Sequence, residues 1–449
     1  MLKIGISGVR GIVGVSMTPD LVMNFASAFG AFVDRRPVVV ARDPRIHGPM
    51  MRSACVSSLL SAGCDVLDLG VCPTPILQKT VRRRRAGGGV SITAGHNDIR
   101  WNALTFIGPD GVYLNPFQGQ EVLDFYHLGK FEKAATDALG RLAFAGAADA
   151  AEPYFDELRS ALDAAAVRAA RFKIVIDACA GAGAPYLARF AETLGFDLIP
   201  INDEPNGFFP HDPEPRPRNA AQAVSVVKVI GADAGFLLNS DVSRVSLVSE
   251  TGEALSEEFT FPLVAGAVLA GRPGPVITNY STSRMIEDVS RSRGSALIRT
   301  KVGQSHLVLA LLQEDGAIAG EGSGGVAVPA FQPAFDGFLT MGKILETMAL
   351  SGKRLSALVG ELPRYHIVKE KIYCPPSRIH AVMNAVRGSF RGREIDTGDG
   401  IRADDHTGWV QIRASGTEPM LRIIAEDLSP ERARARADEL LQAVDVKIR

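Results

Sequence analysis

A short apolar strand, a loop of small residues and an amphipathic helix recur along this chain. One such unit begins with the uninterrupted run 38–40, whose β-branched residues are typical of a strand buried on both faces. Further units begin at residues 173–177 and 275–278. Strands that alternate with helices favour layered α/β domains with parallel sheets. The similar openings therefore predict three α/β domains of related topology.

The last stretch of the chain has a different pattern. Four segments, "YHIVKEKIYCP", "REIDTGDGIRADD", "GWVQIRAS" and "MLRIIAED", are predicted to be strands, and "SPERARARADELLQAV" is predicted to be a closing helix. This order indicates a smaller α+β domain. The length of 449 residues leaves room for three or four domains. We place their boundaries at 1–148, 149–251, 252–364 and 365–449.

Charge and cysteine usage exclude several classes of protein. The 49 Lys and Arg residues balance 50 Asp and Glu residues, which argues against nucleic acid or an anionic membrane as a partner. The single basic run, residues 82–85, is interpreted as a solvated helix end. The five cysteines form no CxxC pair and lie in apolar segments, as reduced core residues would. With no apolar run of about 18 residues and no signal-peptide pattern, we expect a cytoplasmic protein.

The sharpest motif is "RASGTEPMLR", residues 413–422. Gly416 would let the backbone turn its N–H groups toward an anion, and Ser415 and Thr417 would add hydroxyl donors. Arg413 and Arg422 would supply charge, and an arginine can bind a phosphate through two parallel hydrogen bonds. The motif predicts a phosphate-binding loop without a Walker lysine; the alternative is a plain β-hairpin turn.

Several further motifs accompany this loop in order along the chain. They are "GISGVRGIVG", which contains Arg10, "VVVARDPRIHG", "NGFFPHDPEP", "TKVGQSH", which contains Lys301, and "GEGSGG" at 320–325. With these motifs the whole chain resembles the α-D-phosphohexomutases, the superfamily of phosphoglucomutase, phosphomannomutase and phosphoglucosamine mutase. The resemblance implies three related α/β domains with mixed or parallel sheets plus a C-terminal α+β domain around a central cleft. It also implies a hexose phosphate or hexose bisphosphate as the ligand; no protein partner is indicated.

Each domain of the family contributes one loop to that cleft. The resemblance places a phosphoserine loop at 93–98, a metal loop at 239–244, a sugar-binding loop at 320–325 with Glu321 and Ser323, and the phosphate-binding loop at 413–422. Lys301 lies in the domain III loop that approaches the sugar, and Arg10 takes the family's N-terminal arginine position.

The chain departs from the family where phosphoryl transfer would occur. Gly95 replaces the serine that carries the phosphoryl group, and glycine has no side chain to phosphorylate. Asn239 and Ser243 replace two of three metal-binding aspartates and leave only Asp241, although Mg²⁺ prefers carboxylate oxygens. The family's lysine and histidine align with Thr105 and with Gly325. We therefore expect neither phosphoserine-dependent turnover nor a cofactor, and Mg²⁺ only if the protein is an active mutase.

Residues that would only bind the ligand are retained. This set comprises Arg10, Arg244, Lys301, Glu321, Ser323 and the phosphate-binding loop. The pattern favours a phosphohexomutase-fold protein that binds a hexose phosphate without mutase activity. One alternative is an active mutase with a non-standard nucleophile, for which His96 is a candidate acceptor or proton-transfer group. Another is a scaffold or regulatory protein, in which Arg10 and Arg244 would only form structural ion pairs and His96 would maintain the loop.

Overall fold

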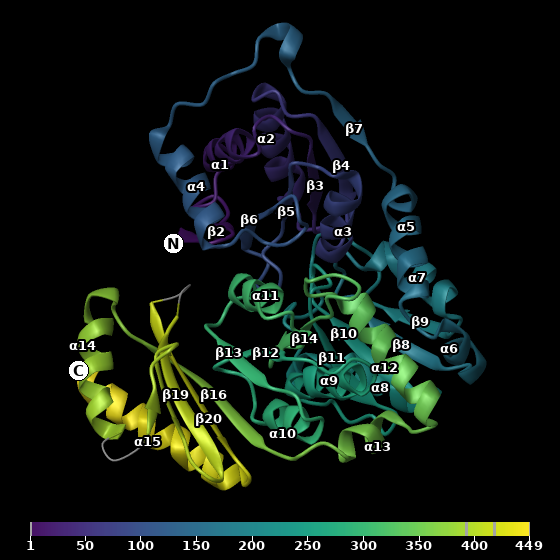
Figure 1. The fold of residues 1–449 in the computed structure, drawn as a ribbon, viewed down its shortest axis with the longest axis vertical. Coiled ribbons are helices and arrows are strands. Elements are labelled where there is room, and N and C mark those ends of the chain that lie inside the picture. The colour runs from purple at the N-terminus through teal and green to yellow at the C-terminus, as the bar shows by residue number, and fades with distance from the viewer. Residues whose placement is uncertain (1, 391–393, 416–418, 449) are drawn as a thin grey trace.

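The computed structural model describes residues 2–390, 394–415 and 419–448. They form four sheets, each with its own helices, as Figure 1 shows. The predicted fold class, three α/β domains followed by an α+β domain, is confirmed.

Domain I contains a seven-stranded sheet with the order β1-β2-β6-β5-β3-β4-β7. Its strands are β1 (Lys3–Gly5), β2 (Gly8–Ile12), β3 (Val38–Arg42), β4 (Val66–Val71), β5 (Gly88–Ile92), β6 (Trp101–Ile107) and β7 (Leu142–Phe144). Its helices are α1 (Pro19–Phe32), α2 (Gly48–Ser61), α3 (Thr74–Arg84) and α4 (Pro116–Leu128). The predicted strand 38–40 lies within β3, between parallel neighbours β4 and β5, which explains its continuous apolar character.

Domains II and III share one topology, in which three parallel strands carry an antiparallel strand at one edge. The order is β11-β10-β8-β9 in domain II and β13-β12-β14-β15 in domain III. The domain II strands are β8 (Lys173–Asp177), β9 (Asp197–Ile201), β10 (Ala234–Leu238) and β11 (Val245–Ser249). The domain III strands are β12 (Val276–Asn279), β13 (Leu297–Thr300), β14 (Ile318–Glu321) and β15 (Gly325–Ala327). The repeated strand–loop–helix pattern of the sequence corresponds to this repeated unit.

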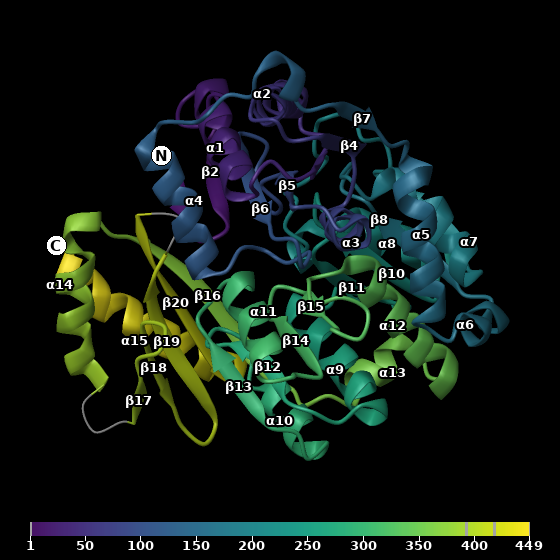
Figure 2. The same ribbon diagram turned by 45° about the horizontal axis from the view of Figure 1, so that its top comes forward.

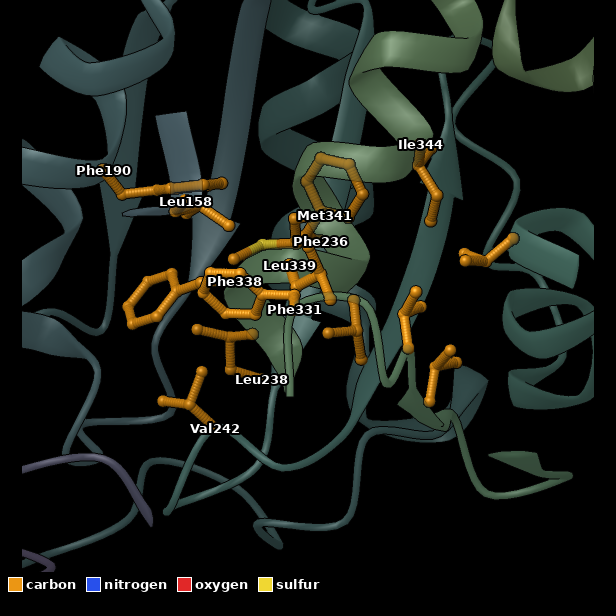
Figure 3. Close-up of a cluster of buried hydrophobic side chains, with 14 of the residues drawn as sticks. Leu158, Phe190, Phe236, Leu238, Val242, Phe331, Phe338, Leu339, Met341 and Ile344 are labelled. Atoms are coloured by element: carbon orange, nitrogen blue, oxygen red, sulfur yellow. The ribbon is translucent and has the colours of Figure 1, made fainter. Parts of the chain in front are cut away.

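Nine helices surround these two sheets in the described part of the chain. They are α5 (Ala147–Ser160), α6 (Ala164–Ala170), α7 (Leu187–Leu194), α8 (Ala221–Ile230), α9 (Thr260–Gly271), α10 (Met285–Ser292), α11 (Gln304–Gln313), α12 (Gly337–Ser351) and α13 (Leu355–Gly360). Helix α12 follows the domain III sheet but also packs on α6 of domain II. Figure 3 shows Phe338 and Met341 of α12 beside Phe190 of α7 and Leu238 of β10.

Domain IV is an antiparallel sheet of order β16-β20-β19-β18-β17, with α14 (Pro376–Arg387) and α15 (Pro430–Ile448). Its strands are β16 (His366–Tyr373), β17 (Ile395–Asp396), β18 (Ile401–Asp404), β19 (Gly408–Ala414) and β20 (Met420–Asp427). One large hydrophobic core extends through domains I, II and III, whereas domain IV has a separate core. Figures 1 and 2 both show domain IV beside domain III.

Several smaller expectations can be checked directly. The Oγ1 atom of Thr18 caps α1 by accepting from the backbone N–H of Leu21 at 3.3 Å. The basic run 82–85 lies exposed at the end of α3, as predicted. All five cysteines are free and buried. None of the helices in the described ranges is long and apolar enough to cross a membrane.

Candidate functional site

The loop that carries Gly95 connects β5 to β6 and is held by a buried arginine of the β3–α2 loop. The guanidinium of Arg45 is fully buried and pairs with Asp43 at 2.9 Å. It also donates, over 2.5–3.1 Å, to the carbonyl oxygens of Gly95, Asn97, Asp98 and Trp101. A charge-assisted network of this kind fixes the loop's backbone. The sequence motif "ARDPR" matches the family, but the role of its arginine emerges only from the fold.

Gly95 faces the loop of domain II. Its φ of 53° lies in the left-handed region, which favours glycine. A Cβ atom built on Gly95 would lie 3.8 Å from Asn239 Nδ2 and 3.9 Å from Asp241 Oδ2. A side chain at this position would therefore point at the residues that align with the family's metal ligands. Position 95 retains the space for a side chain but has none.

The loop 239–244 is closed by its own hydrogen bonds. Asp241 Oδ1 accepts from Asn239 Nδ2 at 2.7 Å and from Ser243 Oγ at 2.7 Å. Its Oδ2 accepts from Thr74 Oγ1 at 3.1 Å. The hydroxyl of Ser240 donates to the carbonyl oxygen of Gly95 at 2.7 Å, which joins the two loops. Amide and hydroxyl donors thus surround the single carboxylate of this loop.

These residues do not fit a magnesium ion. Mg²⁺ requires an octahedral set of oxygen ligands, usually including carboxylates. Here both oxygens of Asp241 already accept hydrogen bonds, and Asn239 presents its N–H₂ group to Oδ1. Across the described residues, no cluster of three His, Cys, Asp or Glu side chains could hold a metal. The structure therefore supports no chemical step through a metal at this loop.

We expect magnesium to leave the stability of this protein unchanged. Adding a few millimolar Mg²⁺ should not shift the melting temperature in differential scanning fluorimetry. Asp241→Ala should lower the free energy of unfolding by about 1–3 kcal/mol with or without the metal, because it leaves buried donors unsatisfied. A magnesium-dependent rise in melting temperature that disappears in Asp241→Ala would contradict this expectation.

A chain of hydrogen bonds links the loops of domains I, II and III. Arg244 donates to His96 Nδ1 at 3.2 Å and to Glu321 Oε1 at 2.9 Å. Glu321 Oε1 also accepts from Ser323 Oγ at 2.5 Å, and its Oε2 accepts from Asn279 Nδ2 at 3.1 Å. The structure thus brings together these predicted site residues, which lie far apart in the sequence. Arg244 forms an ion pair with Glu321 within this network, which is compatible both with ligand binding and with a structural role.

The surroundings of His96 keep its imidazole neutral. Burial lowers the pKa of His96 well below its usual value, and four arginines lower it further. Those arginines are Arg244, Arg10, Arg422 and Arg216. Because Arg244 donates to Nδ1, the proton of the neutral ring lies on Nε2. In this arrangement Nδ1 accepts from Arg244, so His96 could act as a phosphoryl acceptor through Nδ1 only after losing this hydrogen bond.

Arg10 and the domain IV arginines complete a positively charged region around His96. Arg10 lies on β2 and donates to Asn97 Oδ1 at 3.3 Å. Arg422 of β20 acts electrostatically on His96, and Arg413 of β19 lies within electrostatic range of Glu321 and Arg422. Arg413 is paired with Arg422 in the strand register. The predicted residues of domains I to IV therefore converge on one region that is suited to an anion.

The remaining predicted residues are less closely connected to this region. Ser415 is described and donates its backbone N–H to the carbonyl oxygen of Met420 at 2.9 Å. Gly416 and Thr417 lie outside the described residues. Lys301 is exposed, and the next residue, Val302, donates its backbone N–H to Asp399 at 3.0 Å. Asp399 in turn lies within electrostatic range of Arg413.

The positions that align with the family's lysine and histidine offer no replacement for them. Thr105 lies on β6 opposite Gly8, on the same sheet face as Arg10, and provides only a hydroxyl group. At Gly325 of β15, an added Cβ atom would lie 2.5 Å from the ring of Phe335. The buried phenylalanine ring thus occupies the space that a side chain at 325 would need.

Sequence reasoning missed an ionic cluster behind the sugar-binding loop. Lys369 Nζ of β16 lies 2.9 Å from Glu257, 2.8 Å from Glu258 and 3.2 Å from the carbonyl oxygen of Gly322. A Cβ atom at Gly322 would overlap the Glu258 carboxylate, which would have to move away from Lys369. Burial raises the pKa of Glu258 to about 7. The sequence around Glu257 and Glu258 does not indicate this cluster, because their partner Lys369 lies 112 residues after Glu257.

Comparison with known proteins agrees with this architecture. Family models of phosphoglucomutase/phosphomannomutase match residues 1–133 (alpha/beta/alpha domain I), 152–252 (domain II), 258–365 (domain III) and 368–443 (C-terminal domain). The chain belongs to the phosphoglucomutase/phosphomannomutase family, a member of the α-D-phosphohexomutases. The predicted family is therefore confirmed.

Two relatives of similar length have the names of different enzymes of this family. The chain is 37% identical to a phosphoglucomutase/phosphomannomutase of Thermococcus kodakarensis, over 96% of this chain and 95% of that protein. It is 34% identical to a probable phosphoglucosamine mutase of Methanopyrus kandleri, over 98% and 97%.

Solved structures share the whole fold. A Burkholderia thailandensis phosphoglucomutase/phosphomannomutase family protein superposes with a TM-score of 0.85 at 25% identity, covering 98% of this chain and 97% of that one. An Aspergillus fumigatus N-acetylphosphoglucosamine mutase in complex with GlcNAc-6P and magnesium shares the fold at 15% identity and a TM-score of 0.62, over 100% of this chain and 96% of that one.

Proposed function

We propose that this protein binds a hexose phosphate and does not carry out the phosphoserine- and magnesium-dependent mutase reaction. The closed hydrogen-bond network of Asn239, Asp241 and Ser243 opposite Gly95 supports this proposal most strongly. A mutase of this family needs a phosphoryl carrier and a cation at that position. Here Gly95 stands at the position of the phosphoryl carrier. In place of cation ligands, Asn239 and Ser243 donate hydrogen bonds to Asp241, the only carboxylate of the loop. No cofactor is required for binding alone.

In this proposal each domain contributes one loop, with the domain boundaries predicted above. The phosphate group would bind Arg413, Ser415, Gly416, Thr417 and Arg422. Sugar hydroxyls would bind Glu321 and Ser323, whose positions are fixed by Arg244 and Asn279. Arg10, Lys301 and the neutral His96 would complete the polar surface of the site, which carries an excess of arginines and so favours an anionic ligand.

The second candidate function is an active phosphosugar mutase with a different phosphoryl acceptor. The names of full-length relatives favour it, since these are called phosphoglucomutase/phosphomannomutase or probable phosphoglucosamine mutase. Such an enzyme would need an acceptor other than Gly95, and the Nδ1 atom of His96 is engaged by Arg244. Intact-protein mass spectrometry after incubation with glucose 1,6-bisphosphate separates the two functions. A phosphorylated protein would support the mutase, and an unchanged mass supports binding alone.

Arg413→Ala should weaken the binding of a hexose phosphate about tenfold or more. A hydrogen bond to a charged group contributes ~1.5–3 kcal/mol, and ~1.4 kcal/mol corresponds to one decade of affinity. Isothermal titration calorimetry with glucose, mannose and glucosamine 6-phosphates measures the change. Arg434→Ala is the matched control, because Arg434 lies exposed on α15 and pairs with Glu370 and Asp438. Equal affinity of Arg413→Ala and the wild type would refute the proposed phosphate site.

A further inference from the structure

Three cationic side chains stand in a row across the domain IV sheet. In the strand register, Lys371 of β16 is opposite Arg422 of β20, and Arg422 is opposite Arg413 of β19. Directly opposite residues of antiparallel strands project from the same face, with Cβ atoms about 4.5–5.5 Å apart. Lys371, Arg422 and Arg413 therefore lie side by side on one face of three adjacent strands.

That face is the one directed toward domain III. The alternate residues Ile412, Leu421 and Ile423 belong to the domain IV core, which α14 and α15 cover. The opposite face carries Gln411, which accepts from Ser281 Oγ of domain III at 2.6 Å. It also carries Lys369, which donates to the carbonyl oxygen of Gly322 in the sugar-binding loop at 3.2 Å. Lys371, two residues beyond Lys369, thus lies on the same face, at the register position of Arg422.

Lys371 adds to this row a charge that forms no ion pair within the described ranges. Like charges placed directly opposite each other on adjacent strands destabilise a sheet. Within the described ranges, Lys371 is exposed and forms no ion pair, and the buried Nε of Arg413 has no hydrogen-bond partner. Burial lowers the pKa of Arg413 and Arg422 lowers it further, whereas the carboxylates of Asp399 and Glu321 raise it. An anion held beside Lys371 would offset its charge.

We propose that Lys371 is a third cationic ligand of the phosphate group, beside Arg413 and Arg422. This inference rests on the proposed hexose phosphate function and assigns a binding residue outside the 413–422 motif. The two arginines offer planar, forked donors, whereas the ammonium group is a compact charge on a flexible stem. It can therefore follow the phosphate oxygens without a fixed geometry. Lys371 acts in binding, and no bond is made or broken.

Calorimetric titration of the full chain with inorganic phosphate and with glucose 6-phosphate tests this assignment. Lys371→Met should weaken binding of both probes about three- to tenfold, and Lys371→Arg should retain most of the affinity. The matched control is Lys447→Met, which removes an exposed lysine from α15, on the other side of the domain IV sheet. A second readout is the melting temperature. Lys371→Met should melt at or above the wild-type temperature without phosphate and gain less stability when phosphate is added.

The outcomes separate this proposal from the proposed function. Weaker binding of inorganic phosphate by Lys371→Met supports Lys371 as the third ligand. If glucose 6-phosphate binds no more tightly than inorganic phosphate, that result counts only against the hexose phosphate function. Unchanged affinity for both probes in Lys371→Met overturns the assignment while leaving the function intact. If the wild type binds neither probe, both proposals fail. A loss of stability in Lys371→Met without phosphate, together with unchanged affinity for both probes, would show a structural role only.

Discussion

Gly95→Ser should leave the protein without hexose phosphate mutase turnover, even in the presence of magnesium. There is room for the new side chain, because the nearest atoms to a Cβ at this position are 3.8 Å away, although the φ of 53° strains any residue other than glycine. It would nevertheless point at the Asn239 amide and at an Asp241 carboxylate that is already hydrogen bonded. Without the cation, transition-state stabilisation of about 4 kcal/mol or more is missing, which corresponds to roughly a thousandfold in rate. Thr105 and Gly325 would still supply no group for proton transfer.

A coupled assay with glucose, mannose and glucosamine 1-phosphates, with glucose 1,6-bisphosphate as activator, measures this turnover. Mass spectrometry of the same samples should show no phosphoserine in Gly95→Ser. The informative control adds Asn239→Asp and Ser243→Asp, which restores three carboxylates to the loop and should produce magnesium binding by calorimetry. Turnover restored by Gly95→Ser alone would show that the loop 239–244 is competent as it stands, against our interpretation.

Lys369→Met should destabilise the protein by about 3 kcal/mol. The lysine pairs with two carboxyl groups whose side chains are only 9% and 3% exposed. Burial opposes the charge of Lys369, but Glu258 and Glu257 raise its pKa above the usual value. Removing one partner of a buried ion pair costs about 3–5 kcal/mol, and we expect the lower end because the lysine side chain remains 25% exposed. Urea unfolding followed by circular dichroism measures the change.

Lys371→Met is the control for this stability measurement, since Lys371 lies two residues along the same strand and is exposed. Its free energy of unfolding without phosphate should not fall. Lys369→Met should in addition weaken hexose phosphate binding, because Lys369 holds the carbonyl oxygen of Gly322 in the sugar-binding loop. A Lys369→Met variant as stable as the wild type would mean that Arg216, 3.9 Å from Glu257, is sufficient to neutralise the cluster.

Much of the fold could be predicted because its signals are local. The strand 173–177 coincides with β8, and Thr18 caps α1 as its sequence position suggests. Helix α14 was not predicted, although Ile379, Val382, Met383 and Val386 have the spacing of an apolar helix face and pack on the domain IV core. Val242 illustrates a further limit. Its φ of 63° is rare for a β-branched residue and costs about 1–3 kcal/mol, and buried packing of its side chain in the shared core offsets this cost.

Only those site residues that lie within recognisable sequence motifs could be predicted. Gly95, Asp241, Glu321 and Arg413 each lie within a recognisable segment of the sequence. The contacts that determine their chemistry involve residues from other segments, such as Thr74 on Asp241 and Lys369 on the sugar-binding loop. No periodicity or spacing encodes such contacts, because they arise only when three domains share a core and the fourth packs beside them. The replacement of metal ligands by mutual hydrogen bonds is likewise visible only in three dimensions.

The most direct test of hexose phosphate binding without phosphoryl transfer is a calorimetric titration of the wild-type protein. Glucose, mannose and glucosamine 6-phosphates are each titrated once in EDTA and once in millimolar Mg²⁺. We predict saturable binding of at least one of them, with the same dissociation constant under both conditions, because the loop 239–244 provides its own hydrogen bonds. Binding that requires magnesium, or no binding of any of the three at millimolar concentration, would contradict this account.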